Sequence, residues 1–260
     1  MRDAGVVVTG AGSGIGAALA RRFAAEGARV VVNDIDPAAA AAVAGPVGAE
    51  AIGADAASED GVAELIARAR ARLGEIDLYC ANAGIARGRG IEASEADWDA
   101  SWQVNVMAHV RAARLLLGPW LERGSGHFIA TVSAAGLLSI PGTATYAVTK
   151  HGALAFAEWL ALSYAHRGLT VQAICPQGVR TPMLVGGETA AERMLLDSAV
   201  EPDDVADATI TAMAEGRFLV LPHPEVAQMY AGRAAEPDRW LRGMNKLQRS
   251  LEQDGQAAGQ

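Results

Sequence analysis

Residues 9–16 read Thr9-Gly10-Ala11-Gly12-Ser13-Gly14-Ile15-Gly16, a glycine-rich segment with the spacing TGxxxGxG. It lies between an apolar run, Val6–Thr9, that predicts a strand and a stretch, Gly16–Glu26, that predicts a helix. Glycines at such a junction let the backbone turn sharply and approach a pyrophosphate, and a helix N-terminus offers free N–H groups to an anion. The segment therefore predicts a dinucleotide site, although a bare strand-to-helix turn would also fit these glycines.

An acidic residue follows this loop at an informative distance. Asp34 stands eighteen residues after Gly16, at the end of the next predicted strand, Arg29–Asn33. An acid near this position can accept a hydrogen bond from the 2′-hydroxyl of an adenosine ribose. Taken alone, Asp34 fits a turn or helix-capping residue. Together with the glycine loop it predicts NAD as the cofactor, in preference to NADP, whose 2′-phosphate would face the carboxylate.

The rest of the chain alternates short apolar strands with helical stretches. Strands are predicted at Val6–Thr9, Arg29–Asn33, Glu50–Gly53, Leu78–Ala81, Phe128–Ser133, Thr170–Cys175 and Phe218–Leu221. Helices are predicted at Gly16–Glu26, Pro37–Ala44, Gly61–Arg72, Asp97–Leu121, Tyr146–Tyr164 and Pro202–Ala214, with a break expected near Gly118-Pro119. Such alternation predicts an α/β fold, a doubly wound parallel sheet with helices on both faces. We expect a single domain, residues 2–222, followed by a C-terminal extension, residues 223–260.

The composition argues against several classes of protein. The 260 residues are 51% hydrophobic, and a formal net charge of −8 argues against a nucleic-acid binder, which normally carries a basic face. No apolar run approaches the ~18 residues of a membrane span, and no signal peptide is expected. The five histidines are scattered without an HExxH motif, so no metal site is expected. Cys80 and Cys175 form no CxxC motif and fit a reducing, cytoplasmic location without disulfides.

A tyrosine and a lysine stand four residues apart in a predicted helix. This spacing places Tyr146 and Lys150 on one helix face, and Lys150 is one of only two lysines in the chain. An adjacent ammonium favours the phenolate over the phenol, whose pKa is near 10, so the pair predicts an acid–base group. Ser133 ends a predicted strand, where ligands of parallel sheets bind, so it and Tyr146 can both donate to one carbonyl oxygen. Each feature alone also fits a bland interpretation, an exposed helix pair or a turn residue.

In this order the residues resemble the pattern of the classical short-chain dehydrogenases/reductases. The resemblance rests on Thr9–Gly16, Asn82-Ala83-Gly84, Asn105, Ser133, Tyr146 and Lys150, and it covers about residues 5–222. It implies a Rossmann-like fold with a seven-stranded parallel sheet, a nicotinamide cofactor, and hydride transfer to or from a carbonyl carbon. It also implies a homo-oligomer, a tetramer or a dimer.

The resemblance assigns roles to individual residues. It implies that Tyr146 is the general acid/base, that Ser133 orients the carbonyl, and that Lys150 lowers the pKa of Tyr146 and binds the ribose. It implies that Asn105 kinks its helix and holds a water against the lysine, while an amide that satisfies its own helix would also fit. The implied contacts to the pyrophosphate are Gly10, Ser13, Gly14, Ile15 and Gly16. Asp55 is implied at the adenine, Asn82 and Gly84 at the adenosine ribose, and Val179 and Thr181 at the carboxamide. Asp34, Tyr146 and Lys150 are further implied cofactor-binding residues.

One position departs from the family pattern. The family usually has Pro-Gly after the sixth strand, and this chain has Pro176-Gln177-Gly178. A glutamine there could point into the substrate pocket, or outward with Gly178 supplying the flexibility. We expect the pocket-facing orientation, which affects substrate geometry and not cofactor binding.

The substrate loops are expected at Ile85–Glu92, Ala134–Thr145 and Leu184–Ser198. Leu137, Leu138, Ile140 and Met183 indicate an apolar pocket, so we expect a hydrophobic secondary alcohol or ketone as substrate. The expected substrate contacts are Ser133, Ile140, Gln177 and Met183. In the third loop, Gly186-Gly187 before the apolar Met194-Leu195-Leu196 fits a lid that closes on the substrate, or else a surface helix.

The function expected from these residues is that of an NAD-dependent alcohol dehydrogenase or ketoreductase acting on a small molecule. Two alternatives stay open: an epimerase or dehydratase with the same cofactor, and a non-catalytic nucleotide-binding scaffold. The complete set Asn105, Ser133, Tyr146 and Lys150 argues against the scaffold.

The C-terminal extension predicts an amphipathic helix. Trp240, Met244, Leu247 and Leu251 recur at helical spacing and form an apolar stripe. The stripe would fit packing on its own domain or contact with another subunit. Glu252–Gln260 is expected to be disordered.

Overall fold

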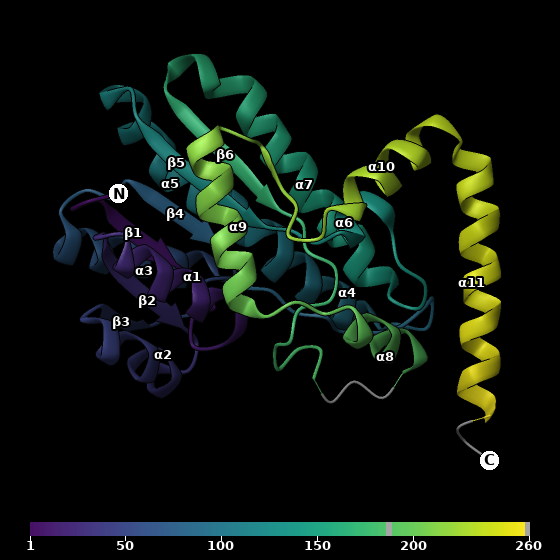
Figure 1. Ribbon diagram of the computed structural model, residues 1–260. Coiled ribbons are helices and arrows are strands. Elements are labelled where there is room, and N and C mark those ends of the chain that lie inside the picture. Colours follow the sequence, from purple (N-terminus) through teal and green to yellow (C-terminus); the bar gives the residue numbers. More distant parts are fainter. Residues whose placement is uncertain (186–188, 258–260) are drawn as a thin grey trace.

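A seven-stranded, fully parallel sheet forms the centre of the protein (Figure 1). The computed structural model describes residues 1–185 and 189–257. The strands are β1 (Gly5–Val8), β2 (Arg29–Asp34), β3 (Glu50–Gly53), β4 (Leu78–Ala81), β5 (Gly126–Thr131), β6 (Leu169–Ile174) and β7 (Leu219–Val220). Their order is β3-β2-β1-β4-β5-β6-β7, so the winding reverses between β1 and β4. The predicted doubly wound α/β fold is confirmed, and its ligand site is expected at this reversal.

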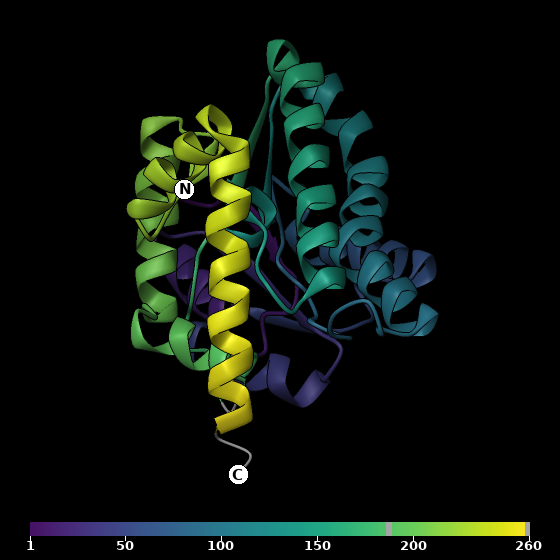
Figure 2. The same cartoon turned by 90° about the vertical axis from the view of Figure 1, so that its right-hand side faces the viewer.

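Helices cover both faces of the sheet, as the two views show (Figure 1, Figure 2). One face carries α1 (Gly14–Ala25), α2 (Pro37–Ala44) and α9 (Pro202–Glu215), and the other carries α3 (Glu59–Leu73), α5 (Ala108–Arg123) and α7 (Ala144–Tyr164). The remaining helices are α4 (Glu95–Trp102), α6 (Ala135–Leu138), α8 (Ala190–Asp197), α10 (Glu225–Ala235) and α11 (Pro237–Ala257), with 3₁₀ turns at Gly45–Val47 and Ala165–Arg167. Side chains of β1 alternate between the two cores: Val6 and Val8 face α1, and Val7 faces the opposite layer. Helices therefore exclude water from both faces of the sheet, which explains why the strand sequences are continuously apolar.

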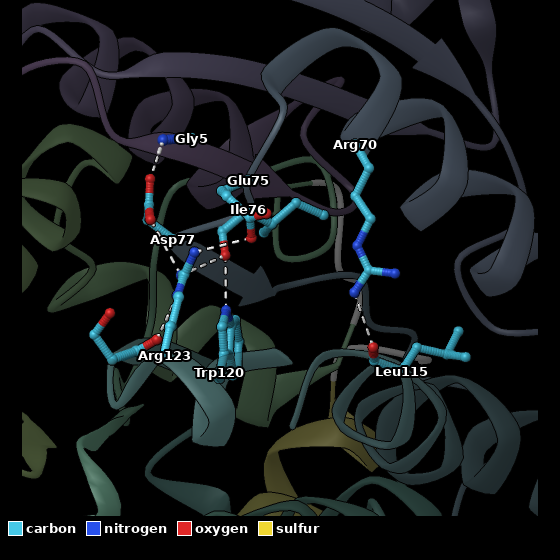
Figure 3. A network of polar contacts seen from close by, with 9 residues as sticks. Gly5, Arg70, Glu75, Ile76, Asp77, Leu115, Trp120 and Arg123 are labelled. Carbon is cyan, nitrogen blue, oxygen red and sulfur yellow. Dashed lines mark hydrogen bonds and ion pairs between the residues drawn. The ribbon is translucent and has the colours of Figure 1, made fainter. Parts of the chain in front are cut away.

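The long helical stretch is interrupted at a different place from the predicted one. A π-helical segment, Gln103–Met107, separates α4 from α5, whereas Pro119 lies inside α5. Proline has no N–H to give to the carbonyl four residues earlier, which here belongs to Leu115. Arg70 of α3 donates its Nη2 to that carbonyl at 3.0 Å and replaces the missing bond (Figure 3). The predicted break near Gly118-Pro119 is therefore wrong.

The amino ends of β1 and β4 are joined by a polar network far from the carboxyl ends (Figure 3). Asp77 accepts a hydrogen bond from the Gly5 N–H at 2.7 Å, and Arg123 pairs with Asp77 at 3.1 Å. The Ile76 carbonyl accepts from the Trp120 indole at 2.7 Å and from Arg123 at 3.0 Å. These contacts satisfy backbone groups where α5 meets the sheet, so the polar residues at the amino ends of β1 and β4 stabilise the fold.

The C-terminal extension folds back on the domain as two helices. Val226 of α10 is fully buried, and Arg233 of α10 donates to the Leu137 carbonyl and lies 3.1 Å from His151 Nε2. From α10 the chain turns into α11, which runs alongside the body of the protein toward α8 (Figure 1, Figure 2). α11 continues past Glu252, where disorder was expected to begin, and Gln248 donates to Glu252 at 2.7 Å along the helix. Residues 258–260 lie outside the described residues.

Candidate active site

A cavity of about 820 Å³ opens at the carboxyl ends of the strands, where the winding reverses. Among the residues expected in the site, those that line it are Gly10, Ser13, Gly14, Ile15, Gly16, Asp34, Asp55, Asn82, Gly84, Ser133, Ile140, Tyr146, Lys150, Gln177, Val179, Thr181 and Met183. Asn105 does not line the cavity and is completely buried behind it. The fold thus brings the expected cofactor, catalytic and substrate residues to one cavity, and Asn105 is buried outside its lining.

The glycine loop has the geometry that requires glycine at defined positions. Gly10 and Gly14 have φ values of +58° and +53°, a region that other residues rarely adopt. A Cβ added to Gly16 would lie 2.4 Å from the Gly10 carbonyl oxygen and 2.5 Å from Asn82 Nδ2. The helix α1 begins at Gly14, so its first N–H groups point from the loop toward the cavity. The loop is therefore built for a close backbone approach to an anion.

Asp34 stands at the end of β2 beside this loop. Its Oδ2 accepts a hydrogen bond from the Gly12 N–H at 2.9 Å, and its Oδ1 accepts from the Asp36 N–H at 3.1 Å. The carboxylate thus has a structural role in the turn and also lines the cavity. Arg21 and Arg22 pair with Asp203 and Asp207 of α9, so both cations are engaged away from Asp34.

Asn82 ties three strand ends together at the floor of the cavity. Its amide nitrogen donates to the carbonyls of Thr9 and Gly10 at 2.8 and 3.1 Å, and its Oδ1 accepts from the Thr131 hydroxyl at 3.0 Å. A Cβ at Gly84 would lie 3.3 Å from Lys150 Nζ and would crowd the buried lysine. Asp55 lies farther out, where its carboxylate accepts from the Ala57 N–H at 2.9 Å.

Tyr146, Lys150 and Ser133 converge on the cavity from α7 and the end of β5. Lys150 is buried, its Nζ lies 5.6 Å from the centre of the Tyr146 ring, and it donates to the Thr131 carbonyl at 2.9 Å. β5 ends at Thr131, two residues before the predicted end, so Ser133 sits in the following turn. There its hydroxyl oxygen accepts from the Ala135 N–H at 3.1 Å.

The protonation of this pair differs from the expectation. Burial is the largest influence on the pKa of Tyr146 and raises it above its ordinary value of 10, while a hydrogen bond with Ser133 acts in the opposite direction. Burial lowers the pKa of Lys150 to about 8. A lowered pKa was expected for Tyr146, but desolvation of the phenolate, to which Cys175 adds, outweighs the hydrogen bond with Ser133. At neutral pH the pair therefore holds a protonated phenol beside an ammonium.

Asn105 positions the loop after β4. Its Oδ1 accepts from the Ile85 N–H at 2.9 Å, and its Nδ2 donates to the Ile85 carbonyl at 2.9 Å and to the Thr149 hydroxyl at 3.0 Å. It lies in the π-helical segment, in agreement with the expected kink. The amide binds a neighbouring loop and α7, so the interpretation that it satisfies its own helix is wrong.

The segment after β6 closes the cavity on the side of α8. Val179 is buried and forms a bridge with Val200, and the Thr181 methyl would lie 2.9 Å from a Cβ at Gly14. Gln177 lines the cavity, and its amide donates to Glu225 of α10 at 3.0 Å. The side chain therefore borders the pocket while anchored to the C-terminal extension.

The apolar loops contribute unequally to the pocket. Leu138, Ile140 and Met183 line the cavity, whereas Leu137 is buried in the core. The third loop forms α8, begun by a capping box between Thr189 and Glu192. Gly186-Gly187, on which the lid prediction rests, lie outside the described residues.

Several residues of the site were missed in the sequence. Thr131 accepts from Lys150 with its carbonyl and donates to Asn82 with its hydroxyl, and Thr9 accepts the N–H groups of Asn82 and Ala83 at 3.0 Å each. Thr149 stands inside the Tyr-Ala-Val-Thr-Lys motif and binds Asn105. Threonines at strand ends are common, so only their position next to the recognised motifs could have indicated them.

Comparisons with known proteins agree with this geometry. The family model described as short chain dehydrogenase matches residues 4–191. The 1-deoxy-11-beta-hydroxypentalenate dehydrogenase of Streptomyces avermitilis is 37% identical and covers 82% of both chains. The 2-(S)-hydroxypropyl-CoM dehydrogenase 3 of Xanthobacter autotrophicus is 32% identical and covers 81% of this chain and 89% of its own.

A solved structure extends the likeness to three dimensions. A short chain dehydrogenase/reductase from Burkholderia phymatum in complex with NAD superposes with a TM-score of 0.82 at 29% identity, covering 92% of this chain and 96% of its own. The sequence motifs, the strand order and these relatives agree. The chain belongs to the short-chain dehydrogenase family.

Proposed function

We propose that the protein transfers a hydride between NAD(H) and a hydrophobic secondary alcohol or ketone. The observation that carries the proposal is the convergence of Tyr146, Lys150 and Ser133 on the same cavity as the glycine loop and Asp34. The relatives support the reaction class, since two of them are named as dehydrogenases of hydroxylated compounds. The Burkholderia relative, which binds NAD, supports the cofactor.

The residues present fit a dinucleotide. A Cβ at Gly10, Gly14 or Gly16 would clash with Ala83, Thr181 or Asn82, so glycine is what lets the backbone of this loop pack so closely beside the N-terminus of α1. Asp34 is the group that would accept the adenosine ribose hydroxyls, and Lys150 the group that would donate to the second ribose. Asp55, Asn82, Gly84, Val179 and Thr181 would complete the contacts. When bound, the nicotinamide supplies the hydride acceptor or donor.

The chain's own residues handle the proton. In ketone reduction, Tyr146 gives its phenolic proton to the developing alkoxide oxygen, and Ser133 donates a second hydrogen bond to that oxygen. The Lys150 ammonium stabilises the resulting phenolate, which burial would otherwise disfavour. In alcohol oxidation the same groups act in reverse, so Tyr146 must first lose its proton.

A panel of secondary alcohols with NAD, monitored by the absorbance of reduced nicotinamide, tests the proposal. We expect turnover of apolar members by the natural protein and none by Tyr146→Phe. Cofactor binding, followed by quenching of protein fluorescence, should be the same in both proteins. A variant that keeps near-normal turnover would remove Tyr146 from the reaction.

We also propose a homo-oligomer, a tetramer or a dimer. Large apolar side chains are exposed along α4, α5 and α7: Trp102, Leu115, Val148, Trp159 and Leu162. Exposed large apolar side chains are favoured at subunit contacts. Light scattering should give a multiple of the chain's mass, and Trp159→Glu should lower it, whereas a monomeric natural protein would refute the proposal.

We propose a cytoplasmic location. Cys80 and Cys175 are both buried and free, as expected for a reducing compartment. Among the described residues, no helix is long and apolar enough to cross a membrane. A fluorescent fusion confined to the cell envelope would contradict this location.

A further inference from the structure

The cavity extends beyond the catalytic residues to the C-terminal extension. Past Tyr146 its wall is mostly apolar, with Glu192 and Ser198 as polar members of the α8 region, and the apolar side chains from α8, α10 and α11 are Met194, Leu195, Met229, Trp240, Met244 and Leu247. The glycine loop and Asp34 line the opposite end of the same cavity. A dinucleotide at the loop end would therefore leave this apolar end to the substrate.

The helix α11 is held in place on its own domain. α10 is anchored by Arg233 on the Leu137 carbonyl and by Gln177 on Glu225, and Trp240 of α11 packs against the hydrophobic core. From there α11 reaches α8, which Arg89 holds through a 3.4 Å ion pair with Glu192 (Figure 1, Figure 2). The apolar stripe of α11 thus faces the cavity of its own chain.

The two sides of α11 differ in the way a pocket wall requires. Trp240, Met244 and Leu247 are partly buried at the cavity, and no charged residue of α11 lines it within the described part of the chain. Leu241, on the same helix, is 64% exposed and does not line the cavity. Side chains that are apolar and line an open cavity gain free energy when a hydrocarbon group displaces water from them.

We propose that α11 forms the outer wall of the substrate site and selects secondary alcohols and ketones that carry a large hydrocarbon group. This proposal rests on the proposed function, because the reacting carbon must lie at Tyr146. The hydrocarbon group extends from there between α8 and α11. Trp240, Met244 and Leu247 are the specificity-determining residues.

Two substrates and two matched variants test the proposal. Cyclohexanol and 1-decalol carry the same reacting group and differ by a fused ring. Leu247→Asp places a charge on the cavity side of α11, and Leu241→Asp places the same charge on its exposed side. We expect Leu247→Asp to lower kcat/KM for 1-decalol on the order of 10- to 100-fold, the range expected for a few buried carbons. Cyclohexanol should change by less than about threefold, and Leu241→Asp should leave both values unchanged.

Binding measured without turnover separates this proposal from the proposed function. Calorimetric titration of 1-decalone into the protein saturated with NAD should show binding by the natural protein and by Leu241→Asp, and at least tenfold weaker binding by Leu247→Asp. Binding with this pattern but no turnover of any alcohol would support the wall and refute the proposed function.

Three results would overturn the role of α11. The natural protein could fail to bind 1-decalone, or the two variants could behave alike while turnover is normal. Light scattering could also show that Leu247→Asp, and not Leu241→Asp, dissociates an oligomer, which would make the stripe a subunit contact. Equal melting temperatures of the two variants verify that both fold.

Discussion

We expect the preference for NAD over NADP to depend on one carboxylate. Asp34 is fixed beside the glycine loop by the Gly12 N–H, at the position where an adenosine ribose would lie. A 2′-phosphate on that ribose would carry nearly two negative charges against it. At ~4 Å and an effective dielectric of 20, one pair of like charges costs about 4 kcal/mol. Partial exposure to solvent reduces this to roughly 2–3 kcal/mol, which corresponds to about a 30- to 150-fold preference for NAD.

Among the residues that the structure describes, the two nearest arginines on α1 do not offset the repulsion. Arg21 and Arg22 are paired with α9, and the adjacent Asp36 adds a further negative charge. We therefore expect Asp34→Ser to reduce the ratio of kcat/KM values for NAD and NADP at least tenfold, by weakening NAD and by relieving the repulsion of NADP. Both cofactors are compared on one alcohol at constant ionic strength.

A neighbouring acid provides the control. Asp36 caps α2 through the Ala38 N–H at 2.8 Å, so Asp36→Ser removes a charge of the same sign two residues away. This variant should change the ratio by less than about threefold, because its carboxylate is exposed and screened. If the natural protein had equal kcat/KM values for NADP and NAD, or if Asp34→Ser and Asp36→Ser changed their ratio equally, Asp34 would be only a turn residue.

Four further predictions follow from the site and its support. Lys150→Arg should lose most of its activity despite the retained charge, because a guanidinium is wider than the ammonium held against the Thr131 carbonyl; activity within threefold would contradict this. The kcat/KM for ketone reduction should fall as pH rises through about 8, where Lys150 loses its proton, and a profile flat to pH 10 would contradict it. Burial lowers the pKa of His109 to about 3, so below pH 6.5 the unfolded chain binds a proton that the folded chain does not. The free energy of unfolding should therefore fall by about 2 kcal/mol from this residue between pH 7 and pH 5. Urea titrations should show a smaller fall in His109→Gln, and an equal fall in both proteins would refute the prediction. Arg70→Met should lower the free energy of unfolding by about 1 kcal/mol with unchanged kcat, because the Leu115 carbonyl loses its donor; a loss of kcat would show that α5 positions the site.

The sheet could be predicted because its strands are short, apolar and separated by glycine-rich turns. Arg29–Asn33 and Leu78–Ala81 agree with β2 and β4 to within a residue, since burial on both faces leaves a continuous apolar signal. The helix interruption could not be placed correctly. Pro119 does not break α5 because Arg70, from a helix distant in sequence, donates to the Leu115 carbonyl that the proline leaves without a partner.

In the site, too, features local in sequence could be predicted, and features that depend on distant segments could not. Motif residues such as Tyr146 and Lys150 were found because their spacing is local to one helix. The pKa of Tyr146 depends on how deeply the fold buries the phenol, which no local pattern shows. The stripe of α11 was visible in the sequence, but only the fold shows that it faces the cavity of its own chain.

The central claim is that a hydride passes between the carbinol carbon of an alcohol and NAD beside Tyr146. It is tested most directly with an apolar secondary alcohol deuterated at that carbon. Mass spectrometry of the cofactor after a single turnover should show one deuterium in the reduced nicotinamide, with none from the alcohol in Tyr146→Phe. Reduced cofactor without deuterium, or conversion of the alcohol with the cofactor left oxidised, would contradict the account.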